Sequence, residues 1–317
     1  MNDKQEAKFQ ELTGRPVGHL VCKMAVPTII SMMVTACYNM VDTYFVGQLH
    51  SNSATGAVGV VFSLMAVIQA VGFFFGHGSG NFISRELGRR NTDSASNMAA
   101  TGFFSALFTG LLICVFGEIF LTPLAAFLGS SPTILPYAKD YLRVILIGAP
   151  WMTASLVLNN QLRFQGNAIY GTIGIASGAV LNIGLDYLLI VSMGTGVDGA
   201  AIATVLSQLL SGGLCAFWFF TRTAKQEELT FRGQSSLLSA GHCKRLAYIG
   251  FPMGFEYSVS AIGAVIMQDA INLLGSTAVA AQTAGEKIRQ MFTVPMASVG
   301  TAMATYVGQN HGAHRTD

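Results

Sequence analysis

Long stretches without any charged residue dominate the pattern of polar and apolar positions along the chain. Windows 94–117, 119–138, 199–221 and 290–314 contain no Lys, Arg, Asp or Glu. Each is about as long as the roughly 20 residues that a helix needs to cross the hydrocarbon core of a membrane. The windows lack the ten-residue alternation of a lipid-facing barrel strand, so their backbone groups must be satisfied within helices. The pattern predicts an all-α polytopic membrane protein.

Eight spans are expected when windows interrupted only by isolated polar residues are included. Their predicted limits are 20–46, 54–83, 96–121, 135–160, 169–192, 198–221, 245–273 and 278–307. The composition agrees, because 51% of the residues are apolar and only 11% are charged. The first 16 residues are polar and lack the apolar core of a removable signal peptide, so we expect the chain to stay intact after insertion.

The positions of the basic residues predict how the helices are oriented. If the N-terminus is cytoplasmic, the outer links 47–53, 122–134, 193–197 and 274–277 contain no Lys or Arg. Fourteen of the eighteen basic residues then lie in or beside the inner links and the two ends of the chain. Because Lys and Arg accumulate in cytoplasmic loops, we expect a cytoplasmic N-terminus.

A repeated pattern divides the chain into two halves. Three pairs of residues match at an offset of 224 or 225 positions: Pro27 with Pro252, Gly76 with Gly300, and Gly88 with Gly312. Internal duplication is the usual construction of secondary transporters. We therefore expect a complete six-helix N-lobe at 1–222, a cytoplasmic linker at 223–244, and the first two helices of a C-lobe at 245–317. Completing the second copy would give a chain of roughly 446 residues and about twelve helices.

Three polar side chains are predicted to lie at one depth in the membrane. With a rise of about 1.5 Å per residue, Asp42 lies roughly 7 Å from the outer end of the first span, and Asp186 and Thr204 lie roughly 9 Å from the outer ends of the fifth and sixth. Asn182 is one turn from Asp186 and shares its face, while Asn39 lies about one turn from Asp42.

The chemistry of these groups suits a cation. Two carboxyl groups with amide and hydroxyl oxygens nearby can hold a proton or a hard cation such as Na⁺. Two charged carboxylates repel each other, so the pair would respond to the supply of protons from outside. We therefore predict a coupling site for H⁺ or Na⁺ at Asp42, Asn182, Asp186 and Thr204. The alternative is that each acid only hydrogen-bonds a neighbouring helix.

Other embedded polar residues are weaker candidates. We expect Tyr38, Asn39, Gln208, Glu256 and Glu286 as lining of an internal cleft or cavity. Tyr38 and Gln208 could equally well pack against neighbouring helices, and Glu286 could pair with a basic residue beside it.

The sequence offers little for catalysis. Five cysteines are scattered without the spacing of a disulfide framework or a zinc site. We find no nucleophile and base pair and no catalytic metal motif, so neither an enzyme activity nor a cofactor beyond the coupling ion is expected. No nucleic-acid partner is expected either.

Several segments resemble one transporter family. They are "MVDTYFVGQL" at the end of the first span, "LNIGLDYLLI" in the fifth, "GAAIATVLSQ" in the sixth, and "AVAAQTAGEKIRQMFTVP" with "GTAMATYVGQNHGA" around the eighth. These segments are similar to the multidrug and toxic compound extrusion (MATE) transporters, especially their DinF-type bacterial branch.

The resemblance implies a function, a location and a site. Members export organic, often cationic compounds against an inward flow of H⁺ or Na⁺, so we expect small organic substrates, a bacterial cytoplasmic membrane and a monomer at full length. The family's cation site in the first lobe falls on Asp42, Asn182, Asp186 and Thr204. Pro27 matches a proline whose helix is proposed to bend during transport, and proline does permit a kink.

Two features depart from the family pattern and leave alternatives open. Members have two lobes of six helices, and here the second lobe has two, which also admits a remnant that does not transport. Glu256 stands where an uncharged polar residue is expected and could add a proton site. A flippase for lipid-linked saccharides is a further alternative, although such a protein would be expected to line its cleft with Arg and Lys.

Overall fold

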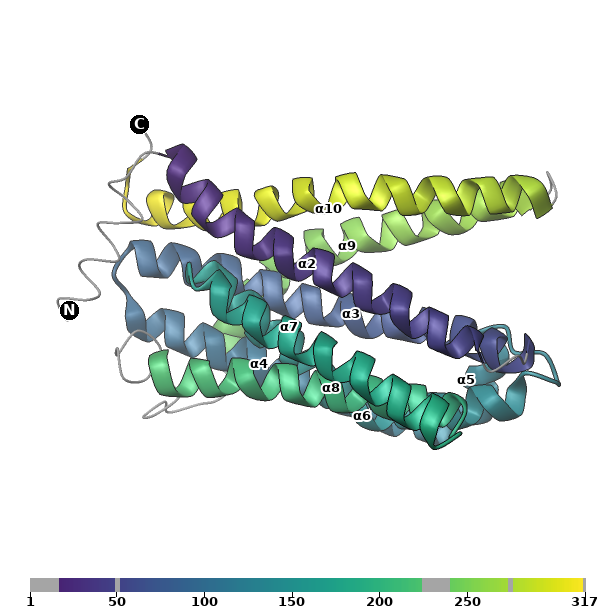
Figure 1. The fold of residues 1–317 in the computed structure, drawn as a ribbon. Coiled ribbons are helices and arrows are strands. Elements are labelled where there is room, and N and C mark those ends of the chain that lie inside the picture. The colour runs from purple at the N-terminus through teal and green to yellow at the C-terminus, as the bar shows by residue number, and fades with distance from the viewer. Residues whose placement is uncertain (1–16, 49–51, 224–239, 273–275, 316–317) are drawn as a thin grey trace.

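The computed structural model describes residues 17–48, 52–223, 240–272 and 276–315. The regular elements within these ranges are helices (Figure 1): α2 (Val17–Gly47), α3 (Asn52–Gly88), α4 (Thr92–Ile119), α5 (Leu121–Phe127), α6 (Leu135–Phe164), α7 (Ala168–Asp186), η1 (Tyr187–Ser192), α8 (Val197–Trp218), η2 (Phe219–Thr223), α9 (Ala240–Asn272) and α10 (Ser276–Gly312).

The long helices lie side by side in an elongated bundle (Figure 1). α3 is central, because it contacts α4, α6, α9 and α10. α2 packs on α7 and α10, and α8 packs on α6 and α7. We call the end of the bundle near Gly47 the outer end and the end near Phe164 the inner end, following the predicted orientation.

The predicted helical membrane fold is confirmed. Six described helices are long and apolar enough to cross a membrane: Val17–Gly47, Gly56–Gly88, Thr92–Ile119, Leu135–Phe164, Ala168–Ser192 and Val197–Thr221. The predicted seventh and eighth spans correspond to α9 and α10, which run along the other helices (Figure 1). The division into lobes and the cytoplasmic N-terminus stay predictions.

Three local features differ from the pattern expected from sequence. The outer link predicted at 122–134 contains the short helix α5, whose Leu121 and Ala125 are buried. The fifth span changes from α-helix to π-helix directly after Asp186. α9 begins at Ala240, inside the linker predicted at 223–244. The prediction placed the start of this helix too late, because polar residues in the first turn of a helix resemble a loop in the sequence.

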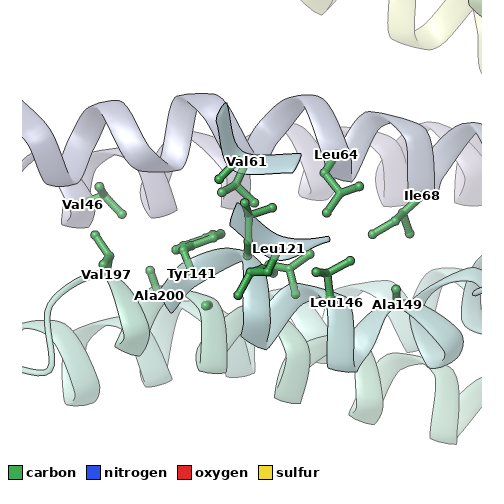
Figure 2. Close-up of a cluster of buried hydrophobic side chains, with 14 of the residues drawn as sticks. Val46, Val61, Leu64, Ile68, Leu121, Tyr141, Leu146, Ala149, Val197 and Ala200 are labelled. Atoms are coloured by element: carbon green, nitrogen blue, oxygen red, sulfur yellow. The ribbon is translucent and has the colours of Figure 1, made fainter. Parts of the chain in front are cut away.

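A large apolar cluster closes the outer end of the bundle. Figure 2 shows Val46 of α2, Val61, Leu64 and Ile68 of α3, Leu121 of α5, Tyr141, Leu146 and Ala149 of α6, and Val197 and Ala200 of α8. These side chains are almost completely removed from the surrounding medium. Five helices are thereby held in a fixed arrangement, since close-packed interiors tolerate little change in volume.

Glycines let α3 approach α6 closely. Side chains at Gly76 and Gly80 of α3 would overlap Asn160 and Phe164 of α6, respectively. Small residues at helix crossings are the usual means of close packing in membranes. The glycine-rich segment 76–80 therefore serves helix packing, as its position inside a span predicts.

Candidate functional site

The structure brings the two predicted carboxyl groups together. Asp42 lies in the last turns of α2, and Asp186 is the last residue of α7. The two side chains lie close enough to interact electrostatically. Asp186 is 0% exposed, whereas Asp42 is partly buried. Helices far apart in the sequence thus place two acids at one point.

Asn182 and Thr204 are buried on the adjoining faces. Asn182 is 1% exposed and lies one turn before Asp186 on α7, while Thr204 on α8 is 5% exposed. The contact between α7 and α8 sets these two side chains beside each other in the wall of one cavity.

Several polar atoms of this group lack hydrogen-bond partners within the described part of the chain. They are both carboxylate oxygens of Asp186, Oδ1 of Asp42, and both amide atoms of Asn182. A buried polar atom without a partner costs about 1–3 kcal/mol, and more when it is charged. So many unpartnered oxygens at one place indicate a site built to hold a proton, a cation or water.

Tyr141 of α6 belongs to the same group, although the sequence reasoning missed it. Its side chain is 1% exposed, interacts with Asp42 and Asp186, and lies within hydrogen-bonding reach of Thr204. The depth argument could have found it, since Tyr141 lies six residues, or about 9 Å, from the outer start of its span. A tyrosine in an apolar helix nevertheless looks like ordinary packing.

The π-helix η1 is another feature that sequence reasoning missed. It spans Tyr187–Ser192 and begins directly after Asp186. Single turns of π-helix are rare and occur often at functional sites. The change in helix type rotates the residues after Asp186 relative to a continuous α-helix, and only one of them, Ile190, is buried.

An apolar layer covers the outer side of the group. Val46 and Ile190 follow Asp42 and Asp186 by one turn, and both belong to the apolar cluster at the outer end. Val197, two turns before Thr204, belongs to it as well. The residues around Asp186 are therefore separated from the outer end of the bundle by packed side chains.

A polar cavity of about 70 Å³ opens on the inner side of the group. Its lining includes the predicted residues Tyr38, Asn182, Thr204 and Gln208. Sequence reasoning missed further polar members of the lining, namely Thr35, Gln69, Ser155, Asn159, Ser207 and Ser211. The hydroxyl group of Tyr38 is within hydrogen-bonding reach of the Gln208 side chain. Such a cavity has room for water or a small ion.

A second, apolar groove lies between α2 and α7. Its volume is about 300 Å³, and its lining is Ile30, Met33, Val34, Cys37, Tyr38, Ala179, Val180 and Ile183. Tyr38 therefore lies between the apolar groove and the polar cavity, with contacts to both.

The structure does not place the remaining predicted residues in this group. Glu256 is on α9, outside the group formed by α2, α6, α7 and α8, and its side chain is exposed. The side chains of Asn39 and Glu286 lie outside the described part of the structure. Pro27 lies inside α2, and its carbonyl oxygen accepts a hydrogen bond of 2.7 Å from the Thr172 hydroxyl of α7.

The donor set fits a proton or a hard cation better than a transition metal. Within the described residues, no three His, Cys, Asp or Glu side chains form a possible metal centre. Carboxylate, amide and hydroxyl oxygens are instead the ligands that hard cations prefer.

Comparison with protein families supplies a context for this geometry. The family model MatE matches residues 27–188 and 252–317, which together make up more than half of the chain. The multidrug export protein MepA of Staphylococcus haemolyticus is 25% identical over 316 residues, which cover 100% of this chain and 69% of that protein. The probable multidrug resistance protein NorM of Thermotoga maritima is 28% identical over 299 residues, or 92% of this chain and 62% of NorM.

Another similar protein carries a different name. A FAD transporter of Shewanella oneidensis is 25% identical over 306 residues, covering 95% of this chain and 67% of the transporter. The chain thus spans about two thirds of the length of these relatives.

Solved structures resemble the fold over almost the whole chain. A MOP superfamily transporter from Pyrococcus furiosus superposes with a TM-score of 0.88 at 28% identity, covering 97% of this chain and 67% of its own. A MATE structure described as straight gives 0.88, and one described as bent gives 0.86, each covering 97% of this chain and 68% of its own, at 28% identity. Together with the family match, these similarities show that the chain belongs to the MatE family of membrane transporters.

Proposed function

We propose that this chain forms the coupling lobe of an antiporter that exports organic compounds in exchange for H⁺ or Na⁺. The observation that carries the proposal is the pair Asp42 and Asp186 beside a polar cavity, in which both carboxylate oxygens of Asp186 and Oδ1 of Asp42 lack partners among the described residues. The names of the relatives MepA and NorM support the export of drugs.

The coupling follows from electrostatics. Two carboxylates at close range in a poorly polarisable medium repel each other strongly when both are charged. A proton or Na⁺ removes this repulsion, with Asn182 and Thr204 supplying further oxygens for the larger ion. Cation binding therefore favours the conformation in which the two acids are close together, and cation loss favours one in which they separate.

Exchange requires that the substrate prefers the other conformation. A ligand shifts a conformational equilibrium only by the difference between its affinities for the two states. The apolar groove beside Tyr38 adjoins the polar cavity, so an amphipathic substrate in the groove would be sensitive to movements of α2 and α7. Organic cations are the first substrates to test, and the FAD transporter among the relatives makes organic anions the second.

The flippase alternative has less support. A phosphate-bearing substrate would be expected to meet Arg or Lys side chains. The described lining of the polar cavity and of the apolar groove contains neither.

Export of ethidium from cells without their own efflux pumps tests the proposal. The complete gene product is compared with its Asp42→Asn and Asp186→Asn variants, and Asp140→Asn serves as control because it changes an exposed carboxylate on α6. We expect export to fall at least about ten-fold in the first two variants, because each loses a carboxylate that contributes about 1.4 kcal/mol or more to cation binding. Export should persist in the control. Undiminished export by Asp42→Asn and Asp186→Asn would show that these acids do not couple transport.

A further inference from the structure

A polar stripe continues from the cavity toward the inner end of the bundle. On α6, Ser155 and Asn159 line the cavity and are four residues apart, and Arg163 follows at the same interval. Residues four apart lie on one face of a helix. The stripe therefore leads from the cavity to Arg163.

α8 carries a matching stripe opposite. Ser207 and Ser211 line the cavity, and Cys215 follows at the same interval of four residues. The amide nitrogen of Asn159 lies 3.9 Å from the sulfur of Cys215, and Cys215 lies close enough to Arg163 to interact electrostatically. The two stripes thus meet at Asn159 and Cys215, and Arg163 follows one turn later on α6.

Arg163 is a buried cation that has no acidic partner among the described residues. Its side chain belongs to a residue that is 5% exposed, and its Nη2 donates a hydrogen bond of 2.9 Å to the hydroxyl of Ser31 on α2. Nε has no hydrogen-bond partner, and no carboxylate forms an ion pair with the guanidinium, within the described residues. Within the described part of the chain, the positive charge is therefore not neutralised by an acid.

Such a charge repels other cations over a long range. Coulomb interactions in a protein interior are several times stronger than in water. In channels, a single Arg at a constriction is enough to exclude protons and other cations. Arg163 does not line the cavity but lies one turn beyond its lining residue Asn159. A cation that moved inward from Asp186 along the stripe would therefore meet Arg163 after it left the cavity.

We propose that Arg163 is an electrostatic barrier that prevents H⁺ or Na⁺ from passing through the lobe to the inner side. This inference rests on the proposed antiport function and deepens it. With the barrier in place, a cation bound at Asp42 and Asp186 leaves only by the route opened during exchange with the substrate. Arg163 is thus a residue that keeps transport coupled, and its removal turns the stripe into a leak.

A purely structural role for Arg163 makes a different prediction. Its hydrogen bond to Ser31 ties α6 to α2, and loss of this tie would loosen the bundle whatever the charge. Ser31→Ala removes the tie and keeps the charge, and Arg163→Lys keeps the charge on a shorter, non-planar group. Arg163→Gln removes the charge and retains hydrogen-bonding capacity.

Cation leak into proteoliposomes without substrate separates these roles. The complete gene product is reconstituted, a potential negative inside is imposed with potassium and valinomycin, and H⁺ and Na⁺ entry are followed with trapped dyes. We expect the rate of cation entry to rise about ten-fold or more for Arg163→Gln, because loss of the positive charge lowers the barrier to cation passage. Ser31→Ala and Arg163→Lys should leak no more than about two-fold above wild type, as is expected if charge alone sets the barrier.

A second variant decides the question if Arg163→Gln does not fold. Ser31→Asp places a carboxylate beside Arg163 and neutralises its charge while preserving the contact. We expect it to leak as Arg163→Gln does, and addition of Asp186→Asn to lower the leak again. The barrier proposal would be wrong if no folded variant with a neutralised charge raised cation entry above wild type. It would also be wrong if Ser31→Ala leaked as much as these variants.

The same vesicles report on the proposed antiport separately. Wild-type protein that shows no cation movement when ethidium is added would refute the antiport function. Wild-type protein that exchanges cations, together with a tight Arg163→Gln variant, would refute only the barrier.

Discussion

Gly88 of α3 and Gly312 of α10 meet in a reciprocal contact at the inner end of the bundle. A side chain at Gly88 would overlap the carbonyl oxygen of Gln309, and a side chain at Gly312 would overlap the carbonyl oxygen of Arg85. Gly88 and Gly312 are 224 residues apart, the repeat offset, and so are Arg85 and Gln309. The two halves of the repeat therefore cross by touching at equivalent backbone positions.

This crossing predicts the effect of adding a single methyl group. Gly88→Ala or Gly312→Ala should lower stability by about 1–3 kcal/mol, because the helices must move apart and overpacking outweighs the better helix propensity of alanine. Thermal unfolding in detergent measures the change.

Matched controls lie on the same two helices. Gly59 of α3 and Gly300 of α10 have no atom within 4 Å of an added Cβ among the described residues. Gly59→Ala and Gly300→Ala should be neutral or stabilise by up to about 1 kcal/mol. Equal losses in all four variants would mean that the crossing is not tightly packed.

Tyr141 is expected to support cation binding without carrying a charge. Its hydroxyl is within reach of Thr204, and its ring is buried against the outer cluster. Tyr141→Phe keeps the ring and removes the hydroxyl that interacts with Thr204 and the two acids. It should weaken cation binding about three- to thirty-fold, as loss of a polar group worth roughly 0.5–2 kcal/mol predicts. Tyr137→Phe, one turn earlier on α6 and exposed, should leave binding unchanged. Equal affinity of the two variants would remove Tyr141 from the site.

The hydrogen bond from Thr172 to Pro27 is expected to hold α2 against α7. Pro27 lacks a backbone N–H and so weakens its helix locally. Its carbonyl oxygen accepts a hydrogen bond from the Thr172 hydroxyl, which ties α7 to this weakened part of α2. Thr172→Val should destabilise the protein by about 1 kcal/mol and raise amide hydrogen exchange in α2 around Pro27.

Thr109→Val is the control for this change. The Thr109 hydroxyl bonds only within its own helix, to the carbonyl of Ser105 at 2.8 Å. Exchange in α2 should therefore stay as in wild type. If Thr172→Val leaves exchange around Pro27 unchanged, the interhelical bond does not restrain this part of α2.

Much of the fold and the acid pair could be predicted from the sequence. Charges are so rare in the apolar spans that Asp42 and Asp186 stand out, and a fixed rise per residue converts sequence position into depth. Depth alone does not fix which way a side chain faces, and it is the structure that brings the two acids close enough to interact electrostatically.

Other features depend on information that the pattern does not contain. The π-helix after Asp186 requires a local change in the backbone hydrogen-bond pattern. The spacing of apolar residues in the sequence does not show this change. The burial of Arg163 could not be predicted from the sequence. A basic residue near the end of a span usually extends its charged group into water. Gly76 and Gly300 match in sequence, but Gly76 packs on Asn160 while Gly300 has no such neighbour among the described residues.

The central claim is that Asp42 and Asp186 form the cation site whose occupancy the substrate controls. Cation release on substrate addition tests it most directly. The purified complete gene product is mixed with ethidium in weakly buffered detergent solution, and H⁺ or Na⁺ release is recorded while ethidium fluorescence reports binding. We predict release by wild type and by Asp140→Asn, and none by the double variant Asp42→Asn with Asp186→Asn. Release by the double variant equal to that of wild type would contradict the assignment of the site.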